Sequence, residues 1–225
     1  MLQQHVKPDG IVIELGAGTG RLALKFVIEG LRVHAVEPAA AMRVILEGKL
    51  TRAGLTMSIE DALAATFVPP AGRVDVVIFP FNGLLHLKTR DEMVASFVHV
   101  HDVLADEGRF ALDCTGPYWE AMLYGPMPWG RADTRVHHAN GRTVLTCDRS
   151  SYDPATRQMR IDIRYLLQGE QQGQEIALHQ TMWTWQQVLA ALNEADFAID
   201  AVYGDVDLAP FDEGSPRLLV SARKR

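Results

Sequence analysis

Residues 10–26 read GIVIELGAGTGRLALKF. The run from Ile11 to Leu15 is almost continuously apolar, which is typical of a strand buried in a parallel sheet. Glycines then stand at every second position, at Gly16, Gly18 and Gly20, and the residues after them have the apolar spacing of a helix. A strand, a glycine turn and a helix let backbone N–H groups approach a ligand closely. This stretch therefore predicts the binding corner of a nucleotide-like cofactor.

The spacing of the glycines distinguishes between cofactors. Dinucleotide-binding turns read G-x-G-x-x-G, with an acidic residue about 20 positions further on. Here the pattern is E-x-G-x-G-x-G, with Glu14 before the first glycine. This form resembles the first motif of the class I S-adenosylmethionine-dependent methyltransferases. An NAD-binding turn and a tight turn without a ligand stay open as alternatives.

Length and composition narrow the class of protein. The 225 residues fit one domain, or one domain with a sizeable insertion. A net charge of −6 disfavours a nucleic-acid partner, because phosphate binding needs basic surface. Cys114 and Cys147 are far apart and are expected as free thiols in a reducing cytoplasm. Since no signal peptide or long apolar run occurs, we expect a cytoplasmic protein without a membrane span.

A second strand is expected over residues 31–36, followed by Glu37 and Pro38. A carboxylate at the end of this strand can accept hydrogen bonds from both ribose hydroxyls, and the resemblance implies this role for Glu37. A solvated strand end is the alternative. Pro38 is expected to open a helix over 39–50, in which Met42 lies where the family often packs a side chain near the cofactor.

A third strand is expected around residues 55–59, followed by Glu60, Asp61 and Ala62. The resemblance implies that an acid here accepts from the adenine amino group. Asp61 is preferred, because the family pattern places its acid directly before a small or apolar residue. Asp61 can equally cap a following helix.

The strand predicted over residues 74–79 runs into the sequence PFNGLLHL. Phe79 to His86 resemble the FNSLxHL segment of small-molecule methyltransferases, and this loop is the expected meeting place of cofactor and substrate. It lacks the acid or amide before proline that marks enzymes acting on base amino groups. His86 is the candidate general base, with helix capping or packing as the alternative. The resemblance assigns cofactor binding to Glu14, Gly16, Ala17, Gly18, Gly20, Arg21, Glu37, Pro38, Met42, Glu60, Asp61, Ala62, Phe79, Phe81, Asn82 and Leu85.

The next elements are a helix over 91–104, capped by Thr89 or Asp91, a turn at 106–109 and a strand over 110–114. His99 and His101 lie two positions apart and do not share a helix face, so no metal site is expected.

The sequence pattern of residues 116–180 differs from that of the preceding part, with alternating β-like segments separated by turn residues. Hairpin signals at 140–141, 153–156 and 169–173 predict three or four antiparallel strands inserted after the fifth strand. Such an insertion resembles the substrate-covering layer of amino-sugar N,N-dimethyltransferases. Aromatic residues in a β layer belong more often to a core than to a pocket. The candidates for substrate binding are Tyr118, Trp119, Trp129 and Trp183.

The C-terminal part predicts a helix over 184–195, capped by Thr184, and an antiparallel pair of strands over 197–203 and 217–222. The expected fold is α/β: a Rossmann-like doubly wound sheet of order 3-2-1-4-5-7-6 with strand 7 antiparallel. Residues 1–115 and 181–225 form its cofactor-binding domain, and residues 116–180 form the inserted subdomain. Residues 1–9 are too short for an element of consequence. Family members usually carry a longer segment there, which folds over the cofactor. Two interpretations therefore stay open: the cofactor is covered in another way, or the true start of the chain lies upstream.

These features predict a methyltransferase that uses S-adenosyl-L-methionine, releases S-adenosyl-L-homocysteine and acts on nitrogen or oxygen of a small molecule. In-line transfer needs chiefly positioning and exclusion of water. The alternatives are a methyltransferase-like binding protein without catalysis and an NAD-dependent reductase. A monomer or a homodimer is expected.

Overall fold

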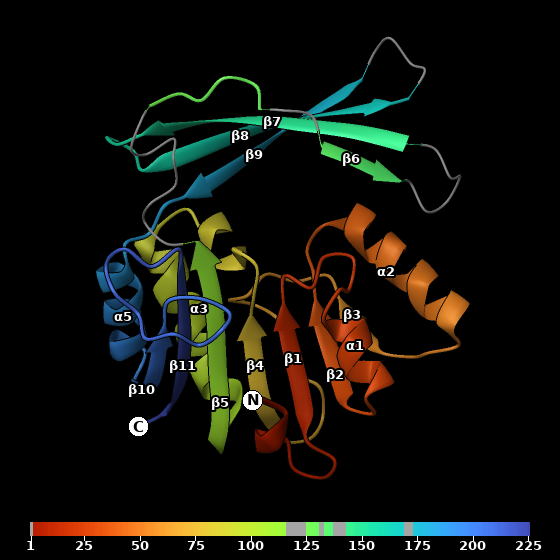
Figure 1. Ribbon diagram of the computed structural model, residues 1–225. Coiled ribbons are helices and arrows are strands. Elements are labelled where there is room, and N and C mark those ends of the chain that lie inside the picture. The colour runs from red at the N-terminus through yellow and green to blue at the C-terminus, as the bar shows by residue number, and fades with distance from the viewer. Residues whose placement is uncertain (1, 116–124, 131–132, 137–142, 169–172) are drawn as a thin grey trace. The chain divides into compact units, whose positions relative to one another are not determined.

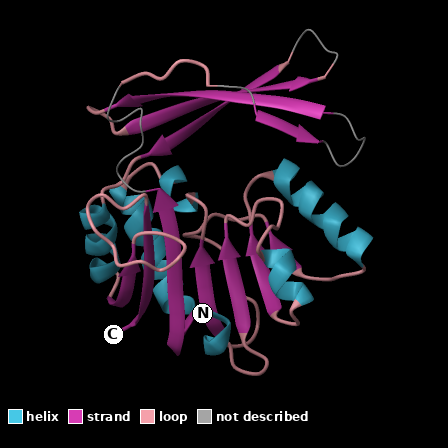
Figure 2. Ribbon diagram, viewed as in Figure 1, coloured by secondary structure: helices cyan, strands magenta, loops and turns pink. Residues whose placement is uncertain are grey.

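The structure is a computed structural model that describes all residues except 1, 116–124, 131–132, 137–142 and 169–172. The chain divides into two compact units. The first consists of Met1–Gly116 with Thr184–Arg225, and the second consists of Pro117–Trp183. Each unit contains its own sheet (Figures 1 and 2).

The sheet of the first unit has seven strands. In chain order they are β1 (Ile11–Leu15), β2 (Arg32–Val36), β3 (Ser58–Glu60), β4 (Val74–Phe79), β5 (Leu104–Thr115), β10 (Phe197–Tyr203) and β11 (Arg217–Lys224). Their order in the sheet is β10-β11-β5-β4-β1-β2-β3. β1 to β5 pair in parallel, while β11 is antiparallel to both β5 and β10. The predicted order 3-2-1-4-5-7-6 with an antiparallel seventh strand is confirmed.

Helical segments connect these strands. They are η1 (Leu2–His5), α1 (Ala23–Ile28), α2 (Ala40–Ala53), η2 (Gly83–His86), α3 (Arg90–Val103) and α5 (Trp185–Glu194). Thr89 caps α3 by accepting from the backbone N–H of Glu92, and Thr184 forms a capping box with Gln187 at the start of α5. α2 ends at Gly54, whose left-handed backbone is the usual glycine stop signal.

The core lies on both faces of the sheet. On one face Ala35 of β2 packs with Leu46 and Leu50 of α2. The other core contains the aromatic rings of Phe97, Phe110 and Phe197 from α3, β5 and β10, with neighbouring ring centroids 5.4 Å apart. No helix within the described residues is long and apolar enough to cross a membrane. Both cysteines are free, Cys114 buried and Cys147 half-buried.

The expected bounds of several elements differ from the observed ones, and two of these differences have a clear structural cause. The turn predicted at residues 106–109 belongs to β5. Leu104 pairs with Val74 while Arg109 pairs with Val76, so the intervening residues bulge out of the ladder. Gly108 suits this bulge, because a Cβ there would lie 2.6 Å from Cγ of Leu104. The third strand covers Ser58–Glu60, not 55–59, because only its last residues pair with β2.

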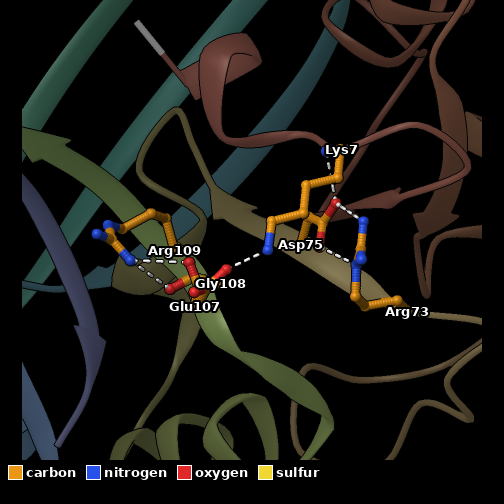
Figure 3. A network of polar contacts seen from close by, with 6 residues as sticks. All are labelled: Lys7, Arg73, Asp75, Glu107, Gly108 and Arg109. Atoms are coloured by element: carbon orange, nitrogen blue, oxygen red, sulfur yellow. Dashed lines mark hydrogen bonds and ion pairs between the residues drawn. The ribbon is translucent and has the colours of Figure 1, made fainter.

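The start of the chain is fastened to the first sheet through a buried carboxylate (Figure 3). Asp75 on β4 is 3% exposed and accepts hydrogen bonds from the backbone N–H of Lys7, at 2.7 Å, and from Nε of Arg73, at 2.7 Å. The Lys7 ammonium forms an ion pair with Glu107 on β5. Residues 1–9, expected to build nothing of consequence, thus include η1 and an anchor to β4.

The second unit is an antiparallel sheet of order β6-β7-β8-β9. Its strands are β6 (Asp133–Val136), β7 (Thr143–Asp153), β8 (Gln158–Leu167) and β9 (Gln174–Thr181). The hairpin predicted at 153–156 joins β7 to β8, and Asp153 stabilises it by accepting from the backbone N–H of Ala155 and the hydroxyl of Thr156. The signal at 140–141 and all but the last residue of the signal at 169–173 lie outside the described residues.

Candidate cofactor site

The glycine turn joins β1 to α1 at the carboxyl end of the sheet. Gly16, Gly18 and Gly20 have φ angles of +65°, +59° and +80°, a region that other residues enter only with strain. Gly16 and Ala17 donate their backbone N–H groups to the carbonyl oxygen of Val36, at 2.8 and 3.1 Å. A Cβ on Gly20 would lie 2.1 Å from Cδ1 of Leu46, so this glycine also permits close packing on α2.

Glu37 holds this turn against the end of β2. It is 7% exposed, and its Oε2 accepts from the backbone N–H of Gly18 at 2.7 Å. Its Oε1 accepts from the backbone N–H of Ala39, at the start of α2, at 2.8 Å. A carboxylate has about four acceptor positions, so each oxygen keeps one lone pair for a further donor. The carboxylate therefore organises the turn and retains acceptor capacity toward a ligand.

Glu14 is a buried acid beneath the same turn. It is 3% exposed, and among the described residues its Oε2 has no hydrogen-bond partner. Burial raises the pKa of Glu14 from 4.5 to about 7, opposed by a backbone hydrogen bond from Ala23 and by the charge of Arg21. A buried carboxyl group with one oxygen that lacks a hydrogen-bond partner is typical of a functional position.

The loop after β4 is held in an uncommon backbone conformation. Phe81 and Asn82 have φ angles of +55° and +61°, in the left-handed region. Oδ1 of Asp113 accepts from the backbone N–H of Phe81 at 3.0 Å, and Oδ1 of Asn82 accepts from the backbone N–H of Thr115 at 2.6 Å. The end of β5 thus fixes this strained loop, as is common at ligand sites.

Some side chains of this loop are buried and support it, whereas Phe81 is exposed. Phe79 and Leu85 are buried, at 4% and 1% exposed, and lie under the loop. A Cβ on Gly83 would lie 2.5 Å from the Phe79 ring, which explains the glycine. Phe81 is 50% exposed, and its ring faces the guanidinium of Arg21 from the glycine turn at 3.0 Å. The Arg21–Phe81 contact brings the two predicted loops together.

His86 ends η2 and is exposed. Partial loss of hydration around its ring lowers the pKa of His86 below the ordinary 6.5, and the charge of Glu37 opposes this shift. At neutral pH the imidazole is therefore mostly uncharged and able to accept a proton.

The two adjacent acids at the end of β3 have different surroundings. Glu60 is part of β3, and its carboxylate accepts from His34 Nε2 and from the backbone N–H of Val68, both at 2.9 Å. Asp61 is exposed, caps no helix and forms an ion pair with Arg43 at 2.6 Å. Arg43 also donates to the carbonyl oxygen of Glu37 at 2.7 Å and so links the two acids expected to hold ribose and adenine.

The other residues predicted to bind cofactor or substrate differ in their exposure and in the residues around them. Pro38 and Met42 are exposed, Ala62 is half-buried and Ala17 is buried. The Trp129 ring lies against the guanidinium groups of Arg149 and Arg164 in the second unit. Trp183 is 5% exposed, and its indole N–H has no partner within the described part of the chain. Tyr118 and Trp119 lie outside the described residues. The substrate roles of these aromatic residues stay predictions.

Sequence reasoning missed Arg43, Asp113 and Thr115. Asp113 and Thr115 lie two positions apart at the end of β5, so their side chains point to the same face of the sheet. Because β5 pairs with β4, this spacing could have indicated that both residues lie beside the loop after β4. Arg43 stands one helical position after Met42 and carried no motif of its own.

Comparison with known proteins agrees with this geometry. Residues 12–108 match a family described as a methyltransferase domain. The uncharacterized methyltransferase YrrT of Bacillus subtilis is 33% identical over 114 residues, which cover 47% of this chain and 52% of that protein. The chain spans about half the length of the curated relatives it matches.

Solved structures resemble almost the whole chain. The CcbJ methyltransferase from Streptomyces caelestis has a TM-score of 0.82 at 22% identity, covering 99% of this chain and 92% of that one. CalS10, an amino pentose methyltransferase from Micromonospora echinaspora, has a TM-score of 0.71 at 23% identity, covering 100% and 87%. At this identity the likeness establishes the fold. Residues 12–108 therefore resemble a methyltransferase domain, and the chain has the fold of S-adenosylmethionine-dependent methyltransferases of known structure.

Proposed function

We propose that the protein transfers a methyl group from S-adenosyl-L-methionine to nitrogen or oxygen of a small-molecule acceptor. The observation that carries this proposal is the hydrogen bond from the backbone N–H of Gly18 to the carboxylate of Glu37. It joins an acid with spare acceptor capacity to a left-handed glycine turn at the carboxyl ends of two neighbouring strands. Ligands of open α/β sheets bind at this edge.

The residues at the turn fit such a cofactor. A Cβ on Gly18 would meet nothing nearer than the carbonyl oxygen of Gly16, at 4.0 Å, so backbone and ligand can approach closely there. Oε2 of Glu14 is a buried acceptor without a partner among the described residues. A ligand with a polar amino-acid tail would supply the donors that this acid lacks.

The cofactor brings a methyl group on a sulfonium, which is already activated for transfer. The protein then has to bind, orient and shield the reactants. Glu37 would accept from the ribose hydroxyls, and Asp61 would accept from the adenine amino group. Phe81 and Asn82, fixed in a strained loop by β5, would border the reacting methyl group and exclude water from it.

The acceptor determines whether a base is needed. A neutral amine attacks without help, whereas a hydroxyl gains from a base that takes its proton. His86, at the end of η2, would take this proton, and its lowered pKa keeps it uncharged at neutral pH. We therefore assign it to hydroxyl acceptors only.

Calorimetry and a turnover assay test the proposal. We expect S-adenosyl-L-homocysteine to bind and NAD not to bind. Labelled S-adenosyl-L-methionine is then incubated with a panel of amines, amino sugars, phenols and carboxylic acids; amino sugars belong in it because CalS10 is an amino pentose methyltransferase. Methylated product supports the proposal. Binding of NAD would contradict the cofactor, and cofactor binding without turnover on any acceptor would favour a non-catalytic binding protein.

His86→Gln separates the two acceptor classes. We expect it to slow transfer to a hydroxyl by about 100-fold and to leave transfer to an amine unchanged. Equal losses for both classes would show that the residue positions the reactants and does not accept a proton.

A further inference from the structure

A chain of three polar side chains links β2 to the edge strand β3. Oγ of Ser58 lies 2.9 Å from Nδ1 of His34, and Nε2 of His34 lies 2.9 Å from Oε2 of Glu60. His34 and Ser58 are direct partners across the two parallel strands, and Glu60 follows on the same face of β3. The sheet register therefore places a hydroxyl, an imidazole and a carboxylate in one line.

The direction of the hydrogen bonds follows from the chemistry of the groups. An ionised carboxylate only accepts, so Nε2 of His34 carries the proton that is donated to Glu60. Nδ1 of the neutral ring is then an acceptor, and the Ser58 hydroxyl must donate to it. This is the order of groups found at an activated serine: nucleophile, base and orienting acid.

The setting of each group suits that role. His34 is 4% exposed, so its ring orientation is fixed by packing, whereas Ser58 is exposed. Glu60 is held in turn by the backbone N–H of Val68 at 2.9 Å. An exposed serine has water as a partner and needs no buried imidazole, so the arrangement exceeds what pairing the two strands requires.

The serine also faces a space that a small molecule can enter. A cavity of about 280 Å³ is lined by Ser58, His34, Thr56, Arg32, Leu31 and Pro70, among others. Arg32 donates to the carbonyl oxygens of Asp9 and Ala71, at 3.0 and 3.5 Å, and brings a fixed positive charge to this wall. A guanidinium has five N–H groups, so donors remain for a negative oxygen in the cavity.

We propose that Ser58, His34 and Glu60 form a second catalytic site, which hydrolyses small carboxylic esters. Oγ of Ser58 attacks the carbonyl carbon and forms a new C–O bond while its proton moves to Nδ1 of His34. The bond to the alcohol breaks, and the alcohol leaves with that proton. Water then attacks the acyl-serine through the same base, which releases the acid and restores the serine. Glu60 stabilises the transient imidazolium, and Arg32 the oxyanion.

A covalent probe tests the site without any methyl donor. The protein is treated with a fluorophosphonate, the modified residue is located by mass spectrometry, and hydrolysis of p-nitrophenyl acetate is followed in parallel. We expect a single adduct on Ser58 and loss of both signals in S58A. Thr51→Ala removes an exposed hydroxyl from α2, outside the residues that line this cavity, and serves as the control, with both signals unchanged.

Two conservative variants distinguish a catalytic relay from a structural one. In His34→Gln the side chain can still bond to both neighbours but cannot take a proton, and Glu60→Gln keeps an acceptor but removes the charge. We expect each to slow labelling by about 100-fold while the thermal unfolding midpoint shows a folded protein. Absence of an adduct on Ser58, a rate that persists in S58A, or undiminished labelling in H34Q and E60Q would each overturn the proposal.

Discussion

Oε2 of Glu37 accepts a hydrogen bond from the backbone N–H of Gly18 at 2.7 Å, which joins the end of β2 to the middle of the glycine turn after β1. The second oxygen of the same carboxylate receives the N–H of Ala39, the first residue before α2. One buried acid therefore sets the positions of two connections at the carboxyl edge of the sheet, the glycine turn after β1 and the link from β2 to α2. Each of its oxygens keeps one lone pair, which we assign to the ribose hydroxyls of the cofactor.

Replacing Glu37 with Ala should remove its hydrogen bonds with Gly18 and Ala39 and also the proposed contact with the ribose. Hydrogen bonds to a charged group contribute about 1.5–3 kcal/mol each, so we expect the affinity for S-adenosyl-L-homocysteine to fall by about tenfold or more. Calorimetry measures the change. Glu47→Ala removes an acid from the exposed surface of α2 and should bind like the unmodified protein. Unchanged affinity in E37A would contradict the ribose assignment.

Substituting Ala for Gly20 should destabilise the first unit through two effects. The residue has a φ of +80°, and the new Cβ would lie 2.1 Å from Cδ1 of Leu46. We expect a loss of about 2–4 kcal/mol in the free energy of unfolding, from backbone strain and overpacking together. Urea unfolding measures it.

Gly30→Ala is the matched control for this variant. Gly30 has a φ of +85°, but a Cβ there meets nothing within 4 Å. It should therefore lose only the strain component, about 1 kcal/mol. Equal losses at the two positions would contradict the close packing of the turn on α2.

Glu14 should make stability depend on pH. Burial raises its pKa in the folded state from 4.5 to about 7, so the folded protein holds the proton more tightly than the unfolded chain. Its contribution to stability is fully present below pH 4.5, declines as the pH rises and is lost above about 7. The shift corresponds to about 3 kcal/mol at most.

Glu14→Gln tests this dependence, because it is uncharged at every pH and has nearly the same shape. We expect the variant to gain stability relative to the unmodified protein between pH 5 and pH 8, in urea unfolding at both values. A difference between the two proteins that does not change with pH would show that Glu14 ionises in the folded state as it does in water.

Loss of the Asp75 carboxylate should loosen the start of the chain. Asp75→Ala leaves the N–H of Lys7 without its buried acceptor and removes the partner of Arg73. We expect a loss of about 2–4 kcal/mol in unfolding free energy and faster hydrogen exchange in residues 2–10. Asp102→Ala, at an exposed position on α3, is the control and should have little effect. Equal effects would contradict a role for Asp75 in anchoring the chain.

The elements encoded by local pattern were predictable from the sequence. β4 is a fully buried strand whose residues are apolar except for Asp75, Thr184 carries its capping partner three residues later, and Asp153 marks the β7–β8 hairpin. The glycine spacing after β1 was equally local, because a left-handed backbone is open to glycine at little cost. These features depend on neighbours within a few positions, so the chain itself determined them.

Contacts between strands could not be read in this way. The bulge in β5, the hydrogen bond from Gly18 to Glu37, and the alignment of Ser58 with His34 all depend on register. Register is set by packing across the whole sheet, and a shift of one residue would turn each of these side chains to the opposite face. The sequence by itself determined the order of the elements and the cofactor turn. Only the tertiary structure decided which polar groups meet, because their partners lie about 20 or more residues away along the chain.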